Sequence, residues 1–418
     1  MKNTLCILAV LLVLLWAVPV WAAQSTGEFY SSLGVEWDGD VKSAEFTTAR
    51  TGFRAAVEES MESGRLHFSL KGWIDWKRME VSAAVDQFWL KGYFRDLDWQ
   101  VGKQLISWGT ADGFNPTNYF SRIGSDALFS GDLRGDAVWA GRLEYYAPDW
   151  SASGVVIPVF TPQTIDTFIR EMILEADPQG AQLLKAVEET KKPGWGNPEV
   201  ALRVETQLEG FDLQVSYFRG YEPLSGMEMV LGPGAPPSLE GTYRRQQFIG
   251  LAVAGTLGSA GVWAEMAYGG PEKFAKSEKP FEMRIPLSIN KKYFQAVVGG
   301  DYTLDIGDGL LVQAQYIYRG QGSFLEPYVM PKETLEPGEI KPTHYLYGRL
   351  SYSINIDTTA DLLVLYGTVE EGGVIRPSLT HRLGDGVQLE LSILQPFGEK
   401  SKFDSIPSQA ALTVKYHF

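Results

Sequence analysis

The sequence predicts an all-β protein: a transmembrane, antiparallel, up-and-down β-barrel of about 18 strands, or 16 if one early hairpin does not cross the membrane. Three observations predict this fold. Segments of alternating apolar and polar residues recur along the whole chain, short and long connections alternate between them, and the last segment ends on an aromatic residue. Alternation with a period of two is typical of strands with one apolar and one polar face.

The N-terminus has the pattern of a secretory signal peptide. Lys2 supplies the positive start, an apolar run follows at 5–18, and Ala22 is the small residue at the cleavage position. The apolar run is shorter than the roughly 20 residues that a membrane-spanning helix needs. The expected domains are a signal peptide, 1–22, and an outer-membrane β-barrel, 23–418.

The expected strands follow from the alternation. In one of the clearest segments, apolar Leu202 and Val204 stand on either side of polar Arg203. The expected strands are 28–37, 45–57, 64–76, 82–94, 98–107, 136–146, 150–160, 198–208, 211–221, 243–257, 260–269, 292–304, 309–319, 343–356, 359–369, 374–383, 386–395 and 409–418.

The connections alternate in length without a break. If the N-terminus is periplasmic, every second connection is expected to be a tight periplasmic turn, and the others are free to grow on the outside. The tight turns are 58–63, 95–97, 147–149, 209–210, 258–259, 305–308, 357–358 and 384–385. The long connections are 108–135, 161–197, 222–242, 270–291, 320–342 and 396–408. A soluble all-β protein has no reason to separate its connections in this way.

The expected surroundings follow from the two faces. Lipid outside and water inside explain why so many strands carry an apolar face, and a closed barrel leaves no sheet edge in the membrane. Aromatic residues near the strand ends are expected to form two girdles. These residues are Trp37, Trp99, Tyr145, Trp150, Tyr217, Tyr268, Tyr302, Tyr318 and Tyr366. Outer-membrane lipid is therefore the first expected partner, and the net charge of −14 argues against nucleic acid.

The last segment, 410–418, is expected to close the barrel. Leu412, Val414 and Phe418 share one parity, which we expect to face lipid, and Lys415 has the other parity. The segment resembles the closing strand of bacterial outer-membrane barrels, where a C-terminal Phe is part of the assembly signal. The resemblance implies the barrel-assembly machinery as a partner that recognises the strand ending at Phe418.

The sequence offers no catalytic or metal-binding pattern. Its four histidines lie in no hydrolase or metalloprotease motif, and its one cysteine, Cys6, lies within the predicted signal peptide. We therefore expect no enzymatic activity, no metal site and no cofactor.

The connection 108–135 is the most unusual. Gly109, Gly113 and Pro116 favour turns, while several aromatic residues here are costly to leave in water. We hypothesise that this loop folds into the lumen and narrows it; the alternative is a loop packed across the top of the barrel. The candidate constriction residues are Trp108, Asp112, Asn115, Asn118 and Arg122.

A resemblance rests on the same stretch. Residues 101–109 read Val-Gly-Lys-Gln-Leu-Ile-Ser-Trp-Gly, and 111–116 read Ala-Asp-Gly-Phe-Asn-Pro. They resemble a signature of porin-like outer-membrane proteins of Gram-negative bacteria, a largely uncharacterised group that includes alginate-export-like barrels. Residues 157–162, Ile-Pro-Val-Phe-Thr-Pro, are a second and weaker match. The resemblance implies location and architecture, but neither a substrate nor catalytic residues.

Two other long connections carry expectations of their own. In 161–197, Phe168, Ile169 and Met172 belong to an apolar stripe that predicts a helix, and 182–190 is expected to add one or two turns. The connection 222–242 is rich in Pro and Gly and is expected to be irregular.

Charged residues on the inward parity are the remaining candidates. The candidate pore-lining residues on the strands are Arg142, Glu144, Arg203, Glu205, Arg349, Arg382 and Lys415. Glu265 and Arg319 have the same parity. Basic side chains in a pore favour anions; alternatively, Arg142 and Arg203 pair with the nearby acids and stiffen the wall.

These observations predict an outer-membrane porin-like channel for small hydrophilic solutes, with a lean towards anions, narrowed by the 108–135 loop. The alternative is a barrel that binds or exports a lipid or polymer together with periplasmic partners. A homo-oligomer is compatible with the same pattern, and the pattern does not identify the solute.

Overall fold

The computed structural model describes most of the chain after the predicted signal peptide. The described residues are 24–37, 43–111, 113–120, 135–163, 165, 170, 173–174, 180–234, 236–276, 279, 281–329, 340–399 and 401–418. The predicted signal peptide and two candidate constriction residues, Asp112 and Arg122, lie outside the described residues.

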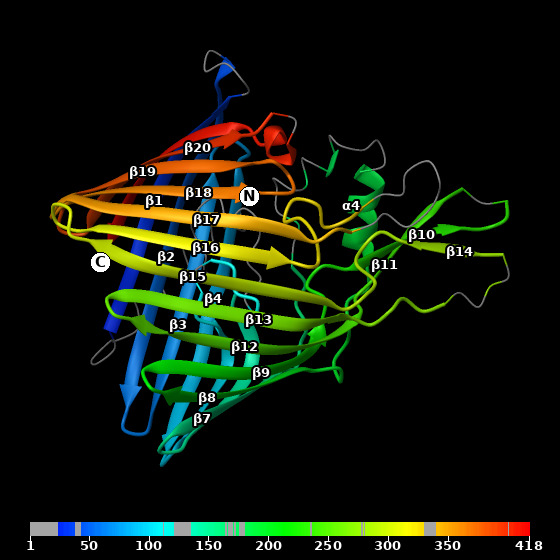
Figure 1. Cartoon of the computed structure of the whole chain (residues 1–418), viewed down its shortest axis with the longest axis horizontal. Coiled ribbons are helices and arrows are strands. Elements are labelled where there is room, and N and C mark those ends of the chain that lie inside the picture. The colour runs from blue at the N-terminus through cyan, green and yellow to red at the C-terminus, as the bar shows by residue number, and fades with distance from the viewer. Residues whose placement is uncertain are drawn as a thin grey trace.

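The chain forms an all-β, antiparallel barrel whose single 18-stranded sheet closes on itself (Figure 1). Its strands are β1 (Gln24–Trp37), β2 (Glu45–Met61), β3 (Gly64–Asp75), β4 (Glu80–Phe94), β5 (Leu97–Gln104), β6 (Val138–Tyr146), β7 (Trp150–Ile157), β8 (Glu199–Leu208), β9 (Phe211–Tyr221), β12 (Arg245–Leu257), β13 (Ala260–Pro271), β15 (Tyr293–Leu304), β16 (Leu310–Arg319), β17 (Thr343–Asn355), β18 (Thr358–Gly367), β19 (Gly372–Gly384), β20 (Val387–Phe397) and β21 (Ser408–His417). The expected 18 strands are confirmed, and the early hairpin belongs to the barrel.

The first and last strands close the barrel. β1 pairs with β21 in an antiparallel register that sets Phe29 opposite Tyr416. Beyond the end of β21, Phe418 exchanges two backbone hydrogen bonds with Gly27, at 2.9 and 3.0 Å, and its ring stacks on Phe29 at 5.5 Å. A Cβ atom at position 27 would lie 2.1 Å from Phe418 Cζ, so the glycine leaves room for the ring.

The two faces of the sheet differ as the alternation predicts. In β12, Ile249 and Leu251 are exposed on the outside, whereas Phe248 and Ala252 are buried on the inside. In β21, Leu412 and Val414 are likewise exposed on the outer face. An outer face of exposed apolar side chains suits lipid rather than water. Within the described residues, no helix is long and apolar enough to cross a membrane.

The long connections gather at one end of the barrel, together with the additional secondary structure (Figure 1). A separate three-stranded sheet lies there, made of β10 (Gly226–Leu231), β11 (Ser238–Thr242) and β14 (Met283–Pro286). The expectation of an irregular 222–242 connection is therefore wrong. Gly234, with φ 75°, allows the turn of the hairpin, and apolar Met227 and Met229 are buried.

The helical expectation in 161–197 is met in part. Helix α4 (Gly180–Glu189) covers most of the expected second turn and buries Leu183 and Leu184. Leu183 packs in one cluster with Met227 and Ile285, so the helix is held against the small sheet. Ile173 and Leu174 are helical, but the other residues of the predicted apolar stripe, Phe168, Ile169 and Met172, lie outside the described residues.

Candidate functional site

We call the connection between β5 and β6 (105–137) the inner loop; of its residues, 105–111 and 113–120 lie against the inner face of the barrel. Two of its glycines have left-handed backbone conformations, Gly109 with φ 94° and Gly113 with φ 81°. A Cβ atom at Gly109 would lie 2.7 Å from Glu265 Oε1 and 2.8 Å from Asn115 Oδ1. The glycine of the Trp-Gly pair is therefore needed both for its conformation and for the close approach of the loop to the wall.

One carboxylate on the wall holds the inner loop. Glu265, on β13, is 2% exposed and alternates with Met266, which is exposed on the outer face. Glu265 Oε1 accepts hydrogen bonds from the backbone N–H of Thr110 and, at 2.7 Å, of Ala111. Thr110 Oγ1 lies 3.2 Å from the same oxygen. Thr117 donates to Glu265 Oε2 from its N–H at 3.3 Å and from its hydroxyl at 2.8 Å. Because the two oxygens of a carboxyl group can accept several hydrogen bonds at once, Glu265 is a clamp for both ends of this segment.

Aromatic packing holds the same loop against the other strands. Trp108 is 1% exposed and meets Phe120 edge to face, with ring centroids 4.8 Å apart. Tyr119 stacks on Phe218 of β9 at 5.0 Å, and its hydroxyl lies 3.0 Å from Ser216 Oγ. These rings share a buried cluster with inward side chains of β6, β7, β8, β12, β13 and β15. Trp108 and Phe120 are therefore buried against the wall and Tyr119 is half-buried there, as the cost of leaving such rings in water requires.

The described part of the inner loop also contacts a second long connection. Phe114 meets Phe324, in the β16–β17 connection, edge to face at 5.5 Å. Asn115 Oδ1 accepts a hydrogen bond from the N–H of Ala111 at 3.0 Å, which closes the turn that presents Phe114. The described part of the loop thus extends from the cluster around Trp108 to the connection that contains Phe324.

Four of the predicted pore-lining residues come together beside this loop. Arg142 pairs with Glu144 on β6, and Arg203 of β8 lies 3.0 Å from Glu205 and 3.8 Å from Glu144. The Arg203 guanidinium also lies over the ring of Trp108, 5.1 Å from its centroid. These four charged side chains therefore pair with one another, as the second of the two expectations stated.

The other predicted wall residues lie apart from this network. Arg349 pairs with Asp361 of β18 at 2.7 Å, and Lys415 pairs with Glu390 of β20 at 3.0 Å. Arg382 is exposed next to a tight turn, and its N–H donates to the carbonyl of Asp357 at 2.8 Å. Asn118, a candidate constriction residue of the inner loop, donates its N–H to the carbonyl of Asn115 at 3.1 Å and accepts the N–H of Trp108 at 3.5 Å. Of the predicted pore-lining residues on the strands, four form one ion-pair network, Arg142, Glu144, Arg203 and Glu205. The other three, Arg349, Arg382 and Lys415, lie at separate positions on the wall.

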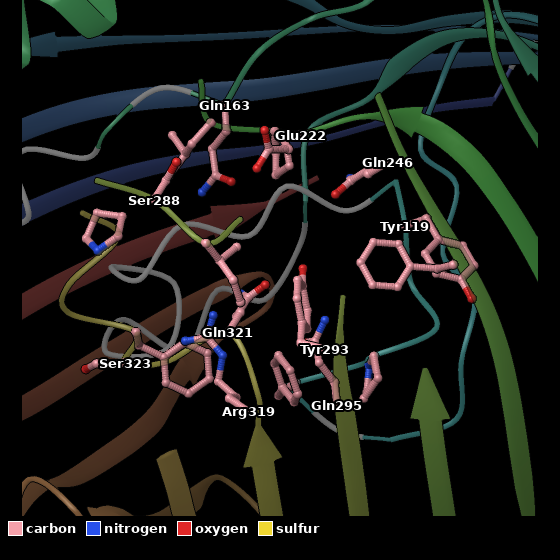
Figure 2. Close-up of a pocket in the computed structure, with 18 of the residues that line it drawn as sticks. Tyr119, Gln163, Glu222, Gln246, Ser288, Tyr293, Gln295, Arg319, Gln321 and Ser323 are labelled. Carbon is pink, nitrogen blue, oxygen red and sulfur yellow. The ribbon is translucent and has the colours of Figure 1, made fainter. Parts of the chain in front are cut away.

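A cavity of about 340 Å³ lies between the inner loop and the outer connections, by which we mean the described parts of 161–197, 222–242, 270–291 and 320–342 (Figure 2). Arg319 and Ser323 lie on one side of it, and Gln163 and Glu222 on another. The amides of Gln246 and Gln295 and the rings of Phe114, Tyr119, Tyr293 and Phe324 also line it. This lining combines aromatic surface with neutral hydrogen-bonding groups and with the charged side chains of Arg319, Glu199, Glu222 and Glu326.

A buried ion pair closes one side of the cavity. Glu222 follows β9, and both of its oxygens lie 2.6 Å from the guanidinium of Arg244. Arg244 also donates to the carbonyl of Ile289 at 2.7 Å and lies over the Phe274 ring at 3.9 Å. Burial raises the pKa of Glu222 to about 6, which outweighs the opposite effect of Arg244. This carboxyl group therefore titrates in mildly acidic conditions.

Sequence reasoning missed the two residues that the geometry makes most prominent. The alternation placed Glu265 and Arg319 on the inner face, but no local pattern related either of them to the inner loop. Thr110 and Thr117 were not singled out either. Among the described residues, no group of three or more His, Cys, Asp or Glu side chains is placed to hold a metal ion.

Comparisons with known proteins define the class of the fold. No protein-family model and no curated protein match the sequence. The fold is similar to the solved structures of OccAB4 and OccAB3 of Acinetobacter baumannii, each with a TM-score of 0.54, at 7% and 11% identity. These matches cover 95% of this chain and 98% and 99% of those chains. The outer membrane protein OpdK of Pseudomonas aeruginosa has a TM-score of 0.51 at 10% identity, with 95% of this chain and 98% of that chain covered.

The fold is therefore that of a bacterial outer-membrane β-barrel. The resemblance to the largely uncharacterised porin-like group, which rests on the Trp-Gly and Asn-Pro signature, stays a prediction.

Proposed function

We propose that this barrel is an outer-membrane channel for small hydrophilic solutes, with a preference for anions, and that the inner loop narrows its lumen. The observation that carries the proposal is the clamp between Glu265 and the segment 110–117. A loop held at several points against the inner wall occupies part of the cross-section that solutes must pass. The porin-like fold supports passage of solutes as the activity.

The anion preference is expected to be modest. Most basic side chains on the described wall have an acidic partner, as in the pairs of Arg203 with Glu205 and of Arg349 with Asp361. A paired cation contributes little field in the pore, whereas an unpaired one attracts anions. We therefore expect the preference for anions to come from the few basic side chains without an acidic partner, rather than from the net charge of −14.

The proposed partners follow from the same fold. Lipid is expected to cover the apolar outer face, and the strand that ends at Phe418 is the proposed contact for the barrel-assembly machinery. Homo-oligomerisation through the outer face is compatible with this proposal.

Planar-bilayer recording tests the proposal directly. The purified barrel is expected to give stable single-channel conductance with a reversal potential that favours anions, and deletion of 110–130 is expected to raise that conductance. An unchanged conductance in the deletion variant would show that the inner loop does not narrow the lumen. A barrel that inserts but stays silent would favour the alternative, in which the barrel binds or exports a lipid or polymer with periplasmic partners.

A further inference from the structure

A row of apolar and aromatic side chains crosses the outer face of the barrel near the end that carries the long connections. Tyr217 of β9 and Tyr268 of β13 lie on either side of Ile249 of β12. Tyr268 lies opposite Phe294 of β15, whose ring centroid is 5.9 Å from that of Tyr318 of β16. We call these five residues the aromatic row. Exposed rings at one level of a barrel mark the boundary between the hydrocarbon and the headgroups of a membrane.

Basic side chains lie directly beyond the aromatic row, on the side of the long connections. Arg219 follows Tyr217 by two residues on β9 and has the same outward parity. Lys292 stands directly before β15 and has the outward parity of Phe294. A Cβ atom at Gly270 would lie 3.1 Å from Lys292 Cα, so Lys292 still lies beside the end of β13. Arg219 and Lys292 are both exposed.

Arg245, the first residue of β12, belongs to the same group. It has the parity of Ile249, and its register makes it a diagonal neighbour of Arg219. Its guanidinium lies over the ring of Tyr221 at 4.1 Å and donates to the carbonyl of Pro198 at 2.9 Å. Both of these partners are neutral, so they hold the guanidinium in place without compensating its charge.

Lys273, in the connection after β13, is the fourth member. The N–H of Glu272 donates to the carbonyl of Arg245 at 2.7 Å, and the N–H of Phe274 donates to Asn290 Oδ1 at 3.1 Å. These two bonds fix the exposed Lys273 between the start of β12 and the chain that leads into β15. We call the four residues the basic rim: Arg219, Arg245, Lys273 and Lys292. The strands that carry it are neighbours in the barrel (Figure 1).

The basic rim keeps an excess of positive charge. It lies on four short segments, 217–221, 245–249, 268–274 and 290–294. Besides the rim itself, the charged residues of these segments are Lys291 and Glu272. Among the ion pairs of the described residues none includes a member of the rim, whereas the adjacent Arg244 is neutralised by Glu222. Because strands lie about 4.8 Å apart, the three intervals from β9 to β15 spread this charge over about 15 Å.

We propose that the basic rim binds the phosphate groups of lipopolysaccharide, the phosphorylated glycolipid of the outer leaflet. Guanidinium and ammonium groups both bind phosphate, and the acyl chains of the lipid lie on the aromatic row and the apolar face below it. The width of the rim suits a headgroup with separated phosphates better than one with a single phosphate. The inference goes beyond the proposed channel and holds whether or not the barrel conducts, because it concerns the outer face alone.

Binding of lipopolysaccharide to the immobilised barrel in non-ionic detergent tests the site. The buffer contains EDTA, so that no divalent cation bridges the phosphates. Intact lipopolysaccharide is expected to bind at least about tenfold more tightly than the same lipid after removal of its phosphates. Each basic residue beside a membrane contributes about fivefold in affinity, so R219Q/K292Q is expected to lose about thirtyfold.

Two double variants are the matched controls. K191Q/K192Q removes two exposed lysines from the same end of the barrel but outside the basic rim, and it is expected to keep the wild-type affinity. R219K/K292R keeps both charges of the rim, and it is expected to stay within about threefold of the wild type. An equal loss in R219Q/K292Q and K191Q/K192Q would overturn the site, because the effect would then follow net charge. A loss in R219K/K292R as large as in R219Q/K292Q would overturn the electrostatic assignment.

The lipid probes supply the remaining outcomes. Equal affinity for intact and dephosphorylated lipopolysaccharide would overturn the site, because the contact would then be made by acyl chains alone. Equal affinity for phosphatidylglycerol, which has a single phosphate, would overturn the assignment to lipopolysaccharide. Binding of intact lipopolysaccharide that weakens as the salt concentration rises supports the site, and binding that does not depend on salt would overturn it.

A readout of stability distinguishes a binding role from a structural one. Because the side chains of Arg219 and Lys292 are exposed, R219Q/K292Q is expected to unfold at the wild-type temperature in detergent alone. Lipopolysaccharide is expected to raise the unfolding temperature of the wild type more than that of R219Q/K292Q. A lower unfolding temperature of R219Q/K292Q in detergent, together with unchanged affinity for lipopolysaccharide, would assign these residues to packing and overturn the site.

Discussion

Thr117 Oγ1 donates a hydrogen bond to Glu265 Oε2 at 2.8 Å and so joins the inner loop to β13 across 148 residues of chain. The other oxygen of the same carboxylate accepts the N–H of Ala111 at 2.7 Å. A single buried side chain therefore holds residues 110–117 of the loop to the wall, beside the aromatic packing around Trp108. If the loop is the constriction, the width of the pore depends on the bonds of this carboxylate.

Replacing Glu265 with alanine is expected to free the inner loop. The loop donors would lose their acceptor while still buried, at a cost of about 2–5 kcal/mol to the free energy of unfolding. Single-channel conductance is expected to rise, and E265Q is expected to lie between the wild type and E265A because its amide oxygen still accepts. Urea unfolding and bilayer recording provide the two measurements. The control E272Q changes an exposed carboxylate on the following connection, and equal effects of E265A and E272Q would contradict the clamp.

Gly109 is expected to tolerate no side chain. In G109A the new Cβ would lie 2.7 Å from Glu265 Oε1 on a backbone with φ 94°, so strain adds to a steric clash. We expect a loss of about 1–3 kcal/mol in the free energy of unfolding, together with a displaced loop and an altered conductance. G141A is the matched control, because nothing lies within 4 Å of a Cβ atom at that position. Equal stability of the two variants would show that the loop does not need this approach.

The buried pair of Glu222 and Arg244 is expected to make the outer connections more stable in mild acid. Burial raises the pKa of Glu222 to about 6 from its ordinary value of 4.5, so the folded state binds the proton more tightly than the unfolded state. This contribution is therefore fully present below about pH 4.5 and is lost as the pH rises through about 6, an effect on the order of 2 kcal/mol.

Urea unfolding between pH 4 and pH 7 measures this dependence. E222Q is expected to remove it, whereas E240Q, which changes an exposed carboxylate on β11, is expected to retain it. A stability that rises with pH in the wild type relative to E222Q would show the opposite sign and contradict the assignment.

The ring at position 418 is expected to matter for assembly. Phe418 is 49% exposed on the outer face and stacks on Phe29 and Tyr416, so a charge there would face lipid. F418D is expected to lower the amount of folded barrel in the outer membrane severalfold, whereas F418W is expected to assemble normally. Heat-modified mobility in gel electrophoresis measures the folded fraction. Normal folding of F418D would show that the ring at position 418 is not needed for assembly.

Most of the barrel could be predicted from the sequence because its two signals are local. Alternation depends on neighbouring residues, and each tight turn carries its own signal, as Gly210 with φ 85° does between β8 and β9. The expected bounds 211–221 and 260–269 agree with the observed strands to within two residues. The small sheet escaped prediction because its third strand, β14, comes from a different connection than the β10–β11 hairpin.

The site was less predictable because its contacts are distant in sequence. The aromatic content of 108–120 correctly indicated a buried loop, but nothing local indicated that Glu265 would receive it. Parity placed Arg142, Glu144, Arg203 and Glu205 on one face, and the register of β6–β8 explains why they meet. Parity places both Arg319 and Arg349 on the inner face. Only the structure distinguishes them, because Arg349 pairs with Asp361 whereas no ion pair among the described residues includes Arg319. Asp112 and Arg122 lie outside the described residues, so their place in the loop stays a prediction.

The seam between β1 and β21 has a consequence for how this protein is made. Leu33 lies opposite Leu412, so the two sides of the seam come from opposite ends of the polypeptide. Until β21 pairs with β1, each of these two strands has an edge of unpaired backbone N–H and C=O groups. Such an edge can associate with strands of other chains. Closing such a distant contact is slow compared with forming the hairpins between neighbouring strands. The nascent barrel thus has a period as an open sheet, during which another protein or strand must cover its two edges.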